Sequence, residues 1–367
     1  MTESQLAHLQ WLVLSSTAVV SVFLGALFHR SHFCTMGAVS DAVIMGSYDR
    51  MRQWALALAV AIFGFGCMAY AGLINPLQSI YATKDLLWLS SLLGGLLFGW
   101  GMVWASGCGS KTLVRLGAGN LKALWVLLVM GVVALSAMKG LLAVGRVQYV
   151  DAFKIEIPHG LFVGEWLSHY LNVPLQVGVF AAACTASVLL LIWVLKDQNF
   201  WSLHNVLTGI LVGLVICGVW WISGVLGHGM EHPETLEEFF LATSSRKMEA
   251  LSFTGPVALT LDALMYFSDG TKRLTTGVVS VLGVCAGSFI SAWFQGSLKL
   301  EGFSNAADMR RHLAGASLMG VGAVLAMGCS IGQGLSGLST LSINSLIASV
   351  AILAGAYAAL QYDLRQA

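Results

Sequence analysis

Charged residues are scarce in this chain. Asp, Glu, Lys and Arg make up 10% of its 367 residues, whereas hydrophobic residues make up 57%. A soluble domain carries about 25% charged residues, so this composition excludes an ordinary soluble protein. The formal net charge of +1 gives no electrostatic basis for binding nucleic acid. The chain is therefore expected to be solvated mainly by lipid.

Several common sequence signatures are also missing. The seven cysteines include no Cys-x-x-Cys pair, and no group of Cys and His has the spacing of a zinc site. These absences argue against a disulfide framework, dithiol exchange and a structural metal. The lack of a Walker sequence argues against direct use of ATP. Residues 1–10 lack the basic start and cleavage site of a signal peptide, so the first apolar run is expected to remain as a helix. No cofactor or metal is expected.

Apolar runs of about 20 residues, long enough to cross a bilayer, recur along the whole chain. The predicted fold is an all-α integral membrane protein that forms a single transmembrane domain over residues 1–367. Nine transmembrane helices are expected, at residues 10–29, 53–74, 86–106, 122–143, 174–195, 203–225, 275–296, 313–328 and 341–360. Two shorter apolar pieces, 33–46 and 252–267, and the Gly-rich segments after Cys108 and Cys329 are expected to be re-entrant half-helices.

The distribution of Lys and Arg predicts the orientation of these helices. With the N-terminus outside and the C-terminus inside, the inner loops hold 11 of the 19 basic residues and 6 of the 18 acidic ones, so they carry a net charge of +5. The outer side then carries 8 basic and 12 acidic residues, a net charge of −4. The sequence therefore predicts a multi-pass protein of the bacterial inner membrane with a periplasmic N-terminus. In the acidic outer loop, an interfacial amphipathic helix is expected to start at Pro233 and to present Phe239 and Phe240 to lipid.

A short sequence recurs 221 positions along the chain. Residues 98–108 match residues 319–329, and the shared positions include two glycine pairs and the final Gly-Cys: Gly99, Gly101, Ala105, Gly107 and Cys108 recur as Gly320, Gly322, Ala326, Gly328 and Cys329. The order of spans and short pieces in residues 9–145 also recurs in residues 203–362. Residues 146–202 supply a connecting loop and one odd helix, so the halves face opposite ways. An inverted repeat with matched interrupted segments predicts a transport site near the membrane midplane.

The cysteines fall into two groups. Cys34, Cys108 and Cys329 stand at breaks between helices, whereas Cys67, Cys184, Cys217 and Cys285 lie inside apolar spans. A buried free cysteine usually behaves as a small hydrophobic residue, which is the interpretation of the second group. The three break cysteines are predicted to line a substrate path, because a thiol is a weak, polarisable donor that suits a soft sulfur acceptor.

Other residues beside the break cysteines are candidates for substrate contacts. They are polar or small residues that directly flank Cys108 and Cys329: Gly107, Lys111, Thr112, Gly328, Ser330 and Gln333. Half-helix N-termini in these segments would supply partial positive charge and free N–H groups for an anion. An alternative interpretation makes Lys111 an interfacial residue and Thr112 and Ser330 helix caps.

Three segments of the chain resemble signature segments of the YeeE/YedE family of bacterial membrane proteins. They are Arg30-x-x-Phe33-Cys34-x-x-Gly37, Gly107-Cys108 and residues 326–335. The resemblance runs over nearly the whole chain and implies an hourglass-shaped, inverted-repeat protein that takes up thiosulfate. It implies that Cys34, Cys108 and Cys329 pass the ion inward by S–H···S contacts. It also implies a small cytoplasmic sulfur-carrier partner of the YeeD/TusA type. The chain departs from the family pattern at His32, Ser106 and Met327.

Three other functions remain open at this point. A membrane sulfurtransferase or thiol oxidoreductase would use Cys108 or Cys329 as a nucleophile, which needs a nearby base or cation. Lys111 could serve Cys108, but no charged residue lies near Cys329 in sequence. A transporter of a selenium compound or of another sulfur compound would use the same path. A channel for a neutral solute would make the cysteines incidental.

Overall fold

The computed structural model describes residues 3–197, 200–231, 237–268 and 274–366, and it is almost entirely helical. Its first elements, as far as the long helix α9, are α1 (Glu3–Ser31), α2 (Thr35–Ser40), η1 (Asp41–Met45), α3 (Asp49–Tyr70), η2 (Pro76–Gln78), β1 (Asp85–Leu86), α4 (Trp88–Trp104), α5 (Gly109–Gly117), α6 (Leu121–Lys139), α7 (Leu141–Gly145), η3 (Arg146–Val150), β2 (Ile155–Glu156), α8 (Val163–Leu171) and α9 (Leu175–Leu195). The strands β1 and β2 form one short antiparallel pair.

The remaining elements are α10 (Leu203–Trp221), η5 (Ile222–Leu226), β3 (His228–Gly229), β4 (Phe239–Phe240), α11 (Thr254–Met265), α12 (Thr276–Phe294), α13 (Ala306–Leu325), η6 (Gly332–Gly337) and α14 (Ile343–Gln366). The strands β3 and β4 form the second antiparallel pair. Several long helices begin where a polar side chain accepts a hydrogen bond from the first turn, as such caps commonly do: Asn120, Ser202, Thr275 and Asn305.

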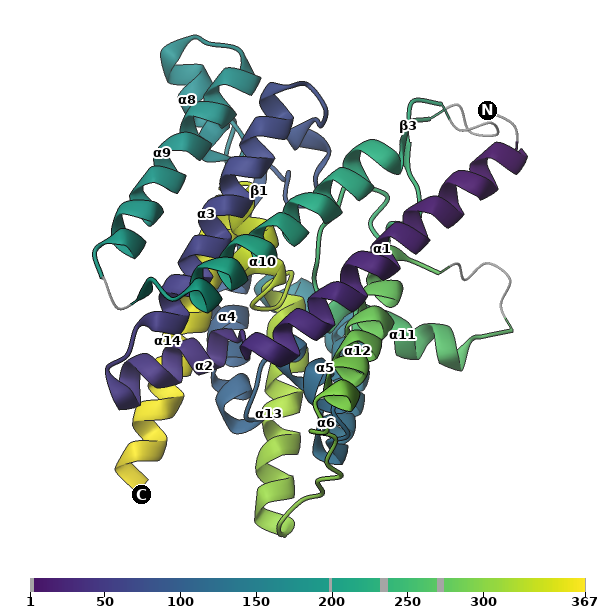
Figure 1. The fold of residues 1–367 in the computed structure, drawn as a ribbon. Helices are drawn as coiled ribbons and strands as arrows, with labels where there is room; N and C mark the ends of the chain where they lie inside the picture. The colour runs from purple at the N-terminus through teal and green to yellow at the C-terminus, as the bar shows by residue number, and fades with distance from the viewer. Residues whose placement is uncertain (1–2, 198–199, 232–236, 269–273, 367) are drawn as a thin grey trace.

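Eight helical segments of the described residues are long and apolar enough to cross a membrane. The prediction of an all-α integral membrane protein is therefore confirmed. The ninth expected span, 313–328, corresponds to α13, whose first turns carry Asp308, Arg310 and Arg311 and so make it less apolar than the others. Helix α13 lies below α4 and beside α6 in Figure 1 but is not among these eight segments, so a ninth crossing stays a prediction.

The amphipathic helix expected in the acidic loop is wrong for the part that the structure describes. Pro233 lies outside the described residues. Phe239 and Phe240 form β4, which pairs with His228 and Gly229, and the amide of Leu241 donates to the carbonyl of Gly227 at 2.7 Å. Backbone pairing with a neighbouring strand has overridden the local pattern of Pro and Glu that suggested a helix.

The centre of the fold is a close crossing of α4 and α13, which lie beside each other in Figure 1. A Cβ atom on Gly322 would lie 2.5 Å from the backbone N of Phe98 and 2.7 Å from the carbonyl O of Gly94. A Cβ atom on Gly101 would lie 2.6 Å from the carbonyl O of Gly315. The two helices run antiparallel with backbone against backbone, which only glycine permits at these positions.

Candidate functional site

The helices α4 and α13 end in the same way, and each ending places a cysteine. The amide of Gly107 donates to the carbonyl of Met102 at 2.9 Å, and the amide of Gly328 donates to that of Ala323 at 2.8 Å. Between these groups, Ser106 and Met327 both adopt a left-handed backbone with φ of 57°. This is the Schellman ending of a helix, which usually has glycine at the left-handed position. The chain then turns sharply, and Cys108 and Cys329 follow one residue after each glycine.

Cys34 and Cys108 form a buried pair. Their Sγ atoms lie 3.9 Å apart, and the side chains are 4% and 0% exposed. Each cysteine is the residue immediately before a helix, Cys34 before α2 and Cys108 before α5. The Sγ of Cys108 also lies 3.3 Å from the hydroxyl of Ser110. The two helix breaks, 74 positions apart in the sequence, thus bring two thiols into contact.

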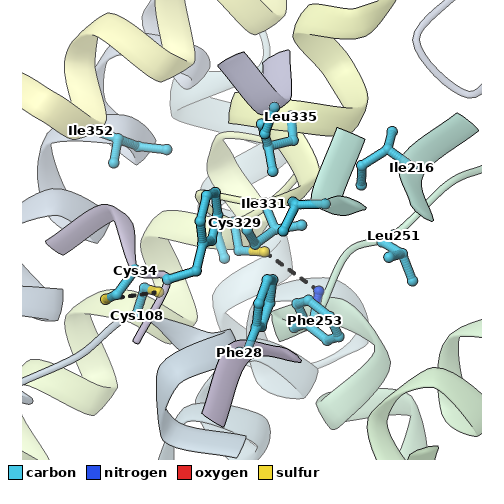
Figure 2. Packing of buried hydrophobic residues seen from close by; sticks show 14 of the residues in the cluster. Phe28, Cys34, Cys108, Ile216, Leu251, Phe253, Cys329, Ile331, Leu335 and Ile352 are labelled. Carbon is cyan, nitrogen blue, oxygen red and sulfur yellow. Dashed lines mark hydrogen bonds between the residues drawn. The ribbon is translucent and has the colours of Figure 1, made fainter. Parts of the chain in front are cut away.

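Cys329 is surrounded by hydrogen-bond donors. Its Sγ accepts from the backbone N–H groups of Phe253 and Gly332, each at 3.4 Å, and lies 3.8 Å from the hydroxyl of Ser252. The side chain is fully buried and belongs to the same core cluster as Cys34 and Cys108 (Figure 2). The two backbone N–H groups donate to this sulfur, and either the thiol or the hydroxyl is the donor in its contact with Ser252.

One cavity reaches the Cys329 segment. It has a volume of about 280 Å³ and is lined by Tyr81, Arg146, Glu249, Ser252, Met327 and Gly328, among others. We call it the Glu249 cavity. Burial raises the pKa of the Glu249 carboxyl, and hydrogen bonds from Ser244, Ser245 and Thr276 oppose that rise. Tyr81 donates from its hydroxyl to the carbonyl of Gly332 at 2.6 Å, which fixes one wall of the cavity against the segment after Cys329.

A second cavity reaches the Cys34 and Cys108 segments. Its volume is about 270 Å³, and its polar lining is basic: His29, His32, Lys111 and Arg115. We call it the Lys111 cavity. Phe33, the residue before Cys34, also lines it. Arg115 donates from its guanidinium to the carbonyl of Ser106 at 3.0 Å, so this basic wall is attached to the helix ending that places Cys108. A basic cavity attracts anions.

The residues predicted to contact substrate differ in whether they line a cavity or bond to the backbone. Lys111 and Gly328 line the two cavities. Thr112 donates to the carbonyl of Cys108 at 2.9 Å, and Gln333 donates to that of Ala326 at 2.6 Å, so both bond to the backbone. A Cβ on Gly107 would lie 3.0 Å from Cγ of Lys111. The hydroxyl of Ser330 is buried and lies beside the sulfur of Cys108, with no oxygen or nitrogen partner among the residues that the structure describes.

The sequence did not single out several residues that form the site. Ser252 and Phe253 precede the short helix α11, as Phe33 and Cys34 precede α2, so the repeated order of elements was the available signal. His29 and His32 had no such signal, because their shared cavity is formed with α5. Glu249 is one acidic residue in a polar loop, and only the fold buries it. Within the described residues, no group of His, Cys, Asp and Glu could hold a metal ion.

Of the four cysteines inside spans, Cys217 and Cys285 contact backbone carbonyls of neighbouring helices. Cys217 lies so close to Gly64 that a side chain at residue 64 would overlap its sulfur, and its thiol points at the carbonyls of Val60 and Ala61. We expect Cys217→Ala to leave uptake of substrate within about twofold of wild type, because it removes one small packing group. Uptake per folded protein, measured with Cys285→Ala as a second example, checks this. Loss of uptake at normal abundance would move Cys217 into the substrate path.

Two kinds of comparison place this chain among known proteins. A sequence profile of a family described as sulphur transport matches residues 30–358. The chain is 25% identical to the thiosulfate transporter TsuA of Escherichia coli (strain K12), and the match covers 94% of this chain and 93% of that protein. It is 23% identical to the thiosulfate transporter TsuA of Spirochaeta thermophila, over 92% of this chain and 95% of that protein.

Proposed function

Because this chain belongs to the sulphur-transport (YeeE/YedE) family, we propose that it takes up thiosulfate across the bacterial inner membrane. Both relatives named above are thiosulfate transporters. The observation that carries the proposal is the arrangement of two cavities and three cysteines. The Glu249 cavity reaches the Cys329 segment, the Lys111 cavity reaches the Cys34 and Cys108 segments, and the three thiols belong to one buried core cluster.

The terminal sulfur of thiosulfate is soft and negatively charged, and it accepts hydrogen bonds from thiols. In the proposed path the ion enters the Glu249 cavity and its terminal sulfur accepts from the S–H of Cys329. It then passes to Cys108, whose Sγ lies 3.9 Å from that of Cys34, and reaches the Lys111 cavity. The N-terminus of α5, which begins directly after Cys108, favours an anion at this step. The basic lining of the Lys111 cavity favours its arrival.

The distribution of basic residues supports an orientation with the Glu249 cavity outside and the Lys111 cavity inside. We expect an impermeant thiol reagent to label Tyr170→Cys only from the periplasm and Leu300→Cys only from the cytoplasm. Both side chains are well exposed, at 75% and 83%, in α8 and in the segment between α12 and α13. The wild type serves as the control for its native cysteines. Labelling of Tyr170→Cys only from the cytoplasm would reverse the orientation.

The two halves, residues 9–145 and 203–362, are proposed to be inverted repeats joined by residues 146–202. Helix contacts support this pairing: α1 packs on α12 as α10 packs on α3, and α4 packs on α14 as α13 packs on α6. The glycines follow the same rule. Gly99 approaches the backbone of α14 at Ile352, and Gly320, 221 positions later, approaches that of α6 at Met130.

The chain is proposed to be a transporter and not an enzyme. A sulfurtransferase would need a base or cation beside its nucleophile, but the contacts of Cys329 are backbone amides and the hydroxyl of Ser252. Lys111, the cation that could serve Cys108, lines the Lys111 cavity, where it is proposed to attract the anion. The Lys111 cavity is also a suitable exit toward a cytoplasmic sulfur-carrier protein of the TusA or YeeD type, which the family resemblance implies. The test of the proposed function is uptake of labelled thiosulfate into proteoliposomes that contain the purified protein. Accumulation above empty liposomes supports it, and none above that background contradicts it.

A further inference from the structure

Four residues with buried polar atoms that lack an oxygen or nitrogen hydrogen-bond partner line one small void in the protein. The atoms are Thr35 Oγ1, Trp54 Nε1, Ser330 Oγ and Ser349 Oγ. Ser330 Oγ lies beside the sulfur of Cys108, and the other three have no partner among the residues that the structure describes. The atoms belong to four separate segments: the start of α2, α3, the turn after Cys329, and α14. Such atoms are rarely left unpaired when buried, so three unpaired groups around one void, with the hydroxyl of Ser330 beside them, indicate a missing acceptor.

The burial and chemistry of these groups define what the void can bind. Thr35, Ser330 and Ser349 are 4%, 1% and 6% exposed. The indole of Trp54 can only donate a hydrogen bond, and the remaining lining residues are Gly334, Ile352 and Leu353. The void has a volume of about 10 Å³, which admits one atom of the size of a water oxygen. It therefore suits one oxygen that accepts hydrogen bonds.

The void lies next to the cysteine path. Thr35 directly follows Cys34 in the chain, and Ser330 directly follows Cys329. The matching place in the other half is filled by different groups. Gly109, 221 positions before Ser330, is the counterpart of Ser330 and has no hydroxyl. Thr254, the first residue of α11, is the counterpart of Thr35, the first residue of α2, and its hydroxyl faces the Sδ of Met130 at 3.8 Å. Among the described residues, the polar groups around the void therefore have no equivalent in the other repeat. The same helix packing forms there without them, so packing alone does not explain why they are present.

We propose that this void is an oxyanion subsite that receives one sulfonate oxygen of thiosulfate while its terminal sulfur passes between Cys329 and Cys108. This inference rests on the proposed function. It gives the ion an orientation, with sulfur toward the thiols and oxygen toward Thr35, Trp54, Ser330 and Ser349. The hydroxyls and the indole recognise the oxygen, and the thiols recognise the sulfur. A resident water is the other oxygen that would fit, and the experiment separates the two.

The experiment measures the KM for thiosulfate uptake in proteoliposomes of wild type, Trp54→Phe, Ser349→Ala and a control, Ser187→Ala. Ser187 is equally buried, at 3% exposed, but donates to the carbonyl of Ala59 and lies on α9. For Trp54→Phe and Ser349→Ala we expect a KM increase of about 10- to 100-fold, the effect of one hydrogen bond to a charged group. The KM of Ser187→Ala should stay within about twofold of wild type, since its hydroxyl touches no substrate.

Thermal unfolding of each purified variant, with and without thiosulfate, completes the test. An oxyanion subsite predicts that thiosulfate stabilises wild type and Ser187→Ala but stabilises Ser349→Ala much less. If the void holds only a water, the thermal stability of the free protein changes while KM and stabilisation by thiosulfate do not, and the inference is wrong. If Trp54→Phe does not fold, Ser349→Ala decides alone. Absence of uptake by wild type would instead overturn the proposed function.

Discussion

Replacing Cys108 with Ala is expected to lower thiosulfate uptake about 10- to 100-fold, because the ion loses a hydrogen bond to a charged group at a dehydrated step. Cys108 is fully buried and contacts both Cys34 and Ser110 through its sulfur. Alanine is smaller and leaves the backbone unchanged, so folded protein should persist. The measurement is the rate of uptake of labelled thiosulfate per amount of folded protein.

Variants of the other two path cysteines extend this prediction. Cys34→Ala and Cys329→Ala should each give a loss of the same order as Cys108→Ala, since each removes the soft donor at one step. Serine should restore only part of the uptake, because a hydroxyl is a harder and shorter donor than a thiol. Cys217→Ala is the matched control for loss of a thiol away from the path. Near-normal uptake in both Cys108→Ala and Cys329→Ala would contradict transport through the three thiols.

Adding one methyl group at the centre of the fold is expected to have the largest effect on stability. In Gly322→Ala the new Cβ would meet the backbone of α4 at Phe98 and Gly94, so α4 and α13 would have to move apart. Overpacking usually costs roughly 1–3 kcal/mol, and here the obstacle is backbone that cannot rotate away. We expect a large drop in the yield and in the thermal stability of the folded protein.

Gly218→Ala is the control for this change. Gly218 also lies inside a transmembrane helix, α10, but a Cβ there would meet nothing within 4 Å. Alanine should be neutral or stabilising at this site, because glycine inside a helix costs about 1 kcal/mol relative to alanine. The paired repeats predict that Gly101→Ala behaves like Gly322→Ala. Equal stability of Gly322→Ala and Gly218→Ala would show that the close helix crossing is unimportant.

The apolar spans and the helix breaks follow from local sequence, and helices occupy the spans that were expected. Apolar length predicts α3, α6 and α9, and the short apolar piece 252–267 is the helix α11. The structure explains why the family usually has glycine where this chain has Ser106 and Met327. Both residues adopt the left-handed backbone conformation in which glycine is favoured. The repeated Gly-Cys sequence predicted both turns because the ending of a helix depends on local backbone geometry.

The site itself depends on contacts that sequence cannot supply. Cys34 meets Cys108 across 74 positions, and the amide of Phe253 meets Cys329 across 76. The donors around the oxyanion void are recognised only because the fold buries them without oxygen or nitrogen partners. Phe239 and Phe240 show the reverse case, because local residues favoured a helix while pairing with His228 and Gly229 made a strand. Tertiary contacts decided each of these outcomes.

In the proposed mechanism, thiosulfate crosses intact through non-covalent contacts with the three thiols. Thiosulfate labelled separately on its terminal sulfur and on its sulfonate sulfur tests this most directly in proteoliposomes. A relay of hydrogen bonds predicts that both labels accumulate in a 1:1 ratio. In a sulfurtransferase, a thiolate would attack the terminal sulfur, form a cysteine persulfide and release sulfite outside. Entry or protein binding of the terminal sulfur alone, with the sulfonate label left outside as sulfite, would contradict the account.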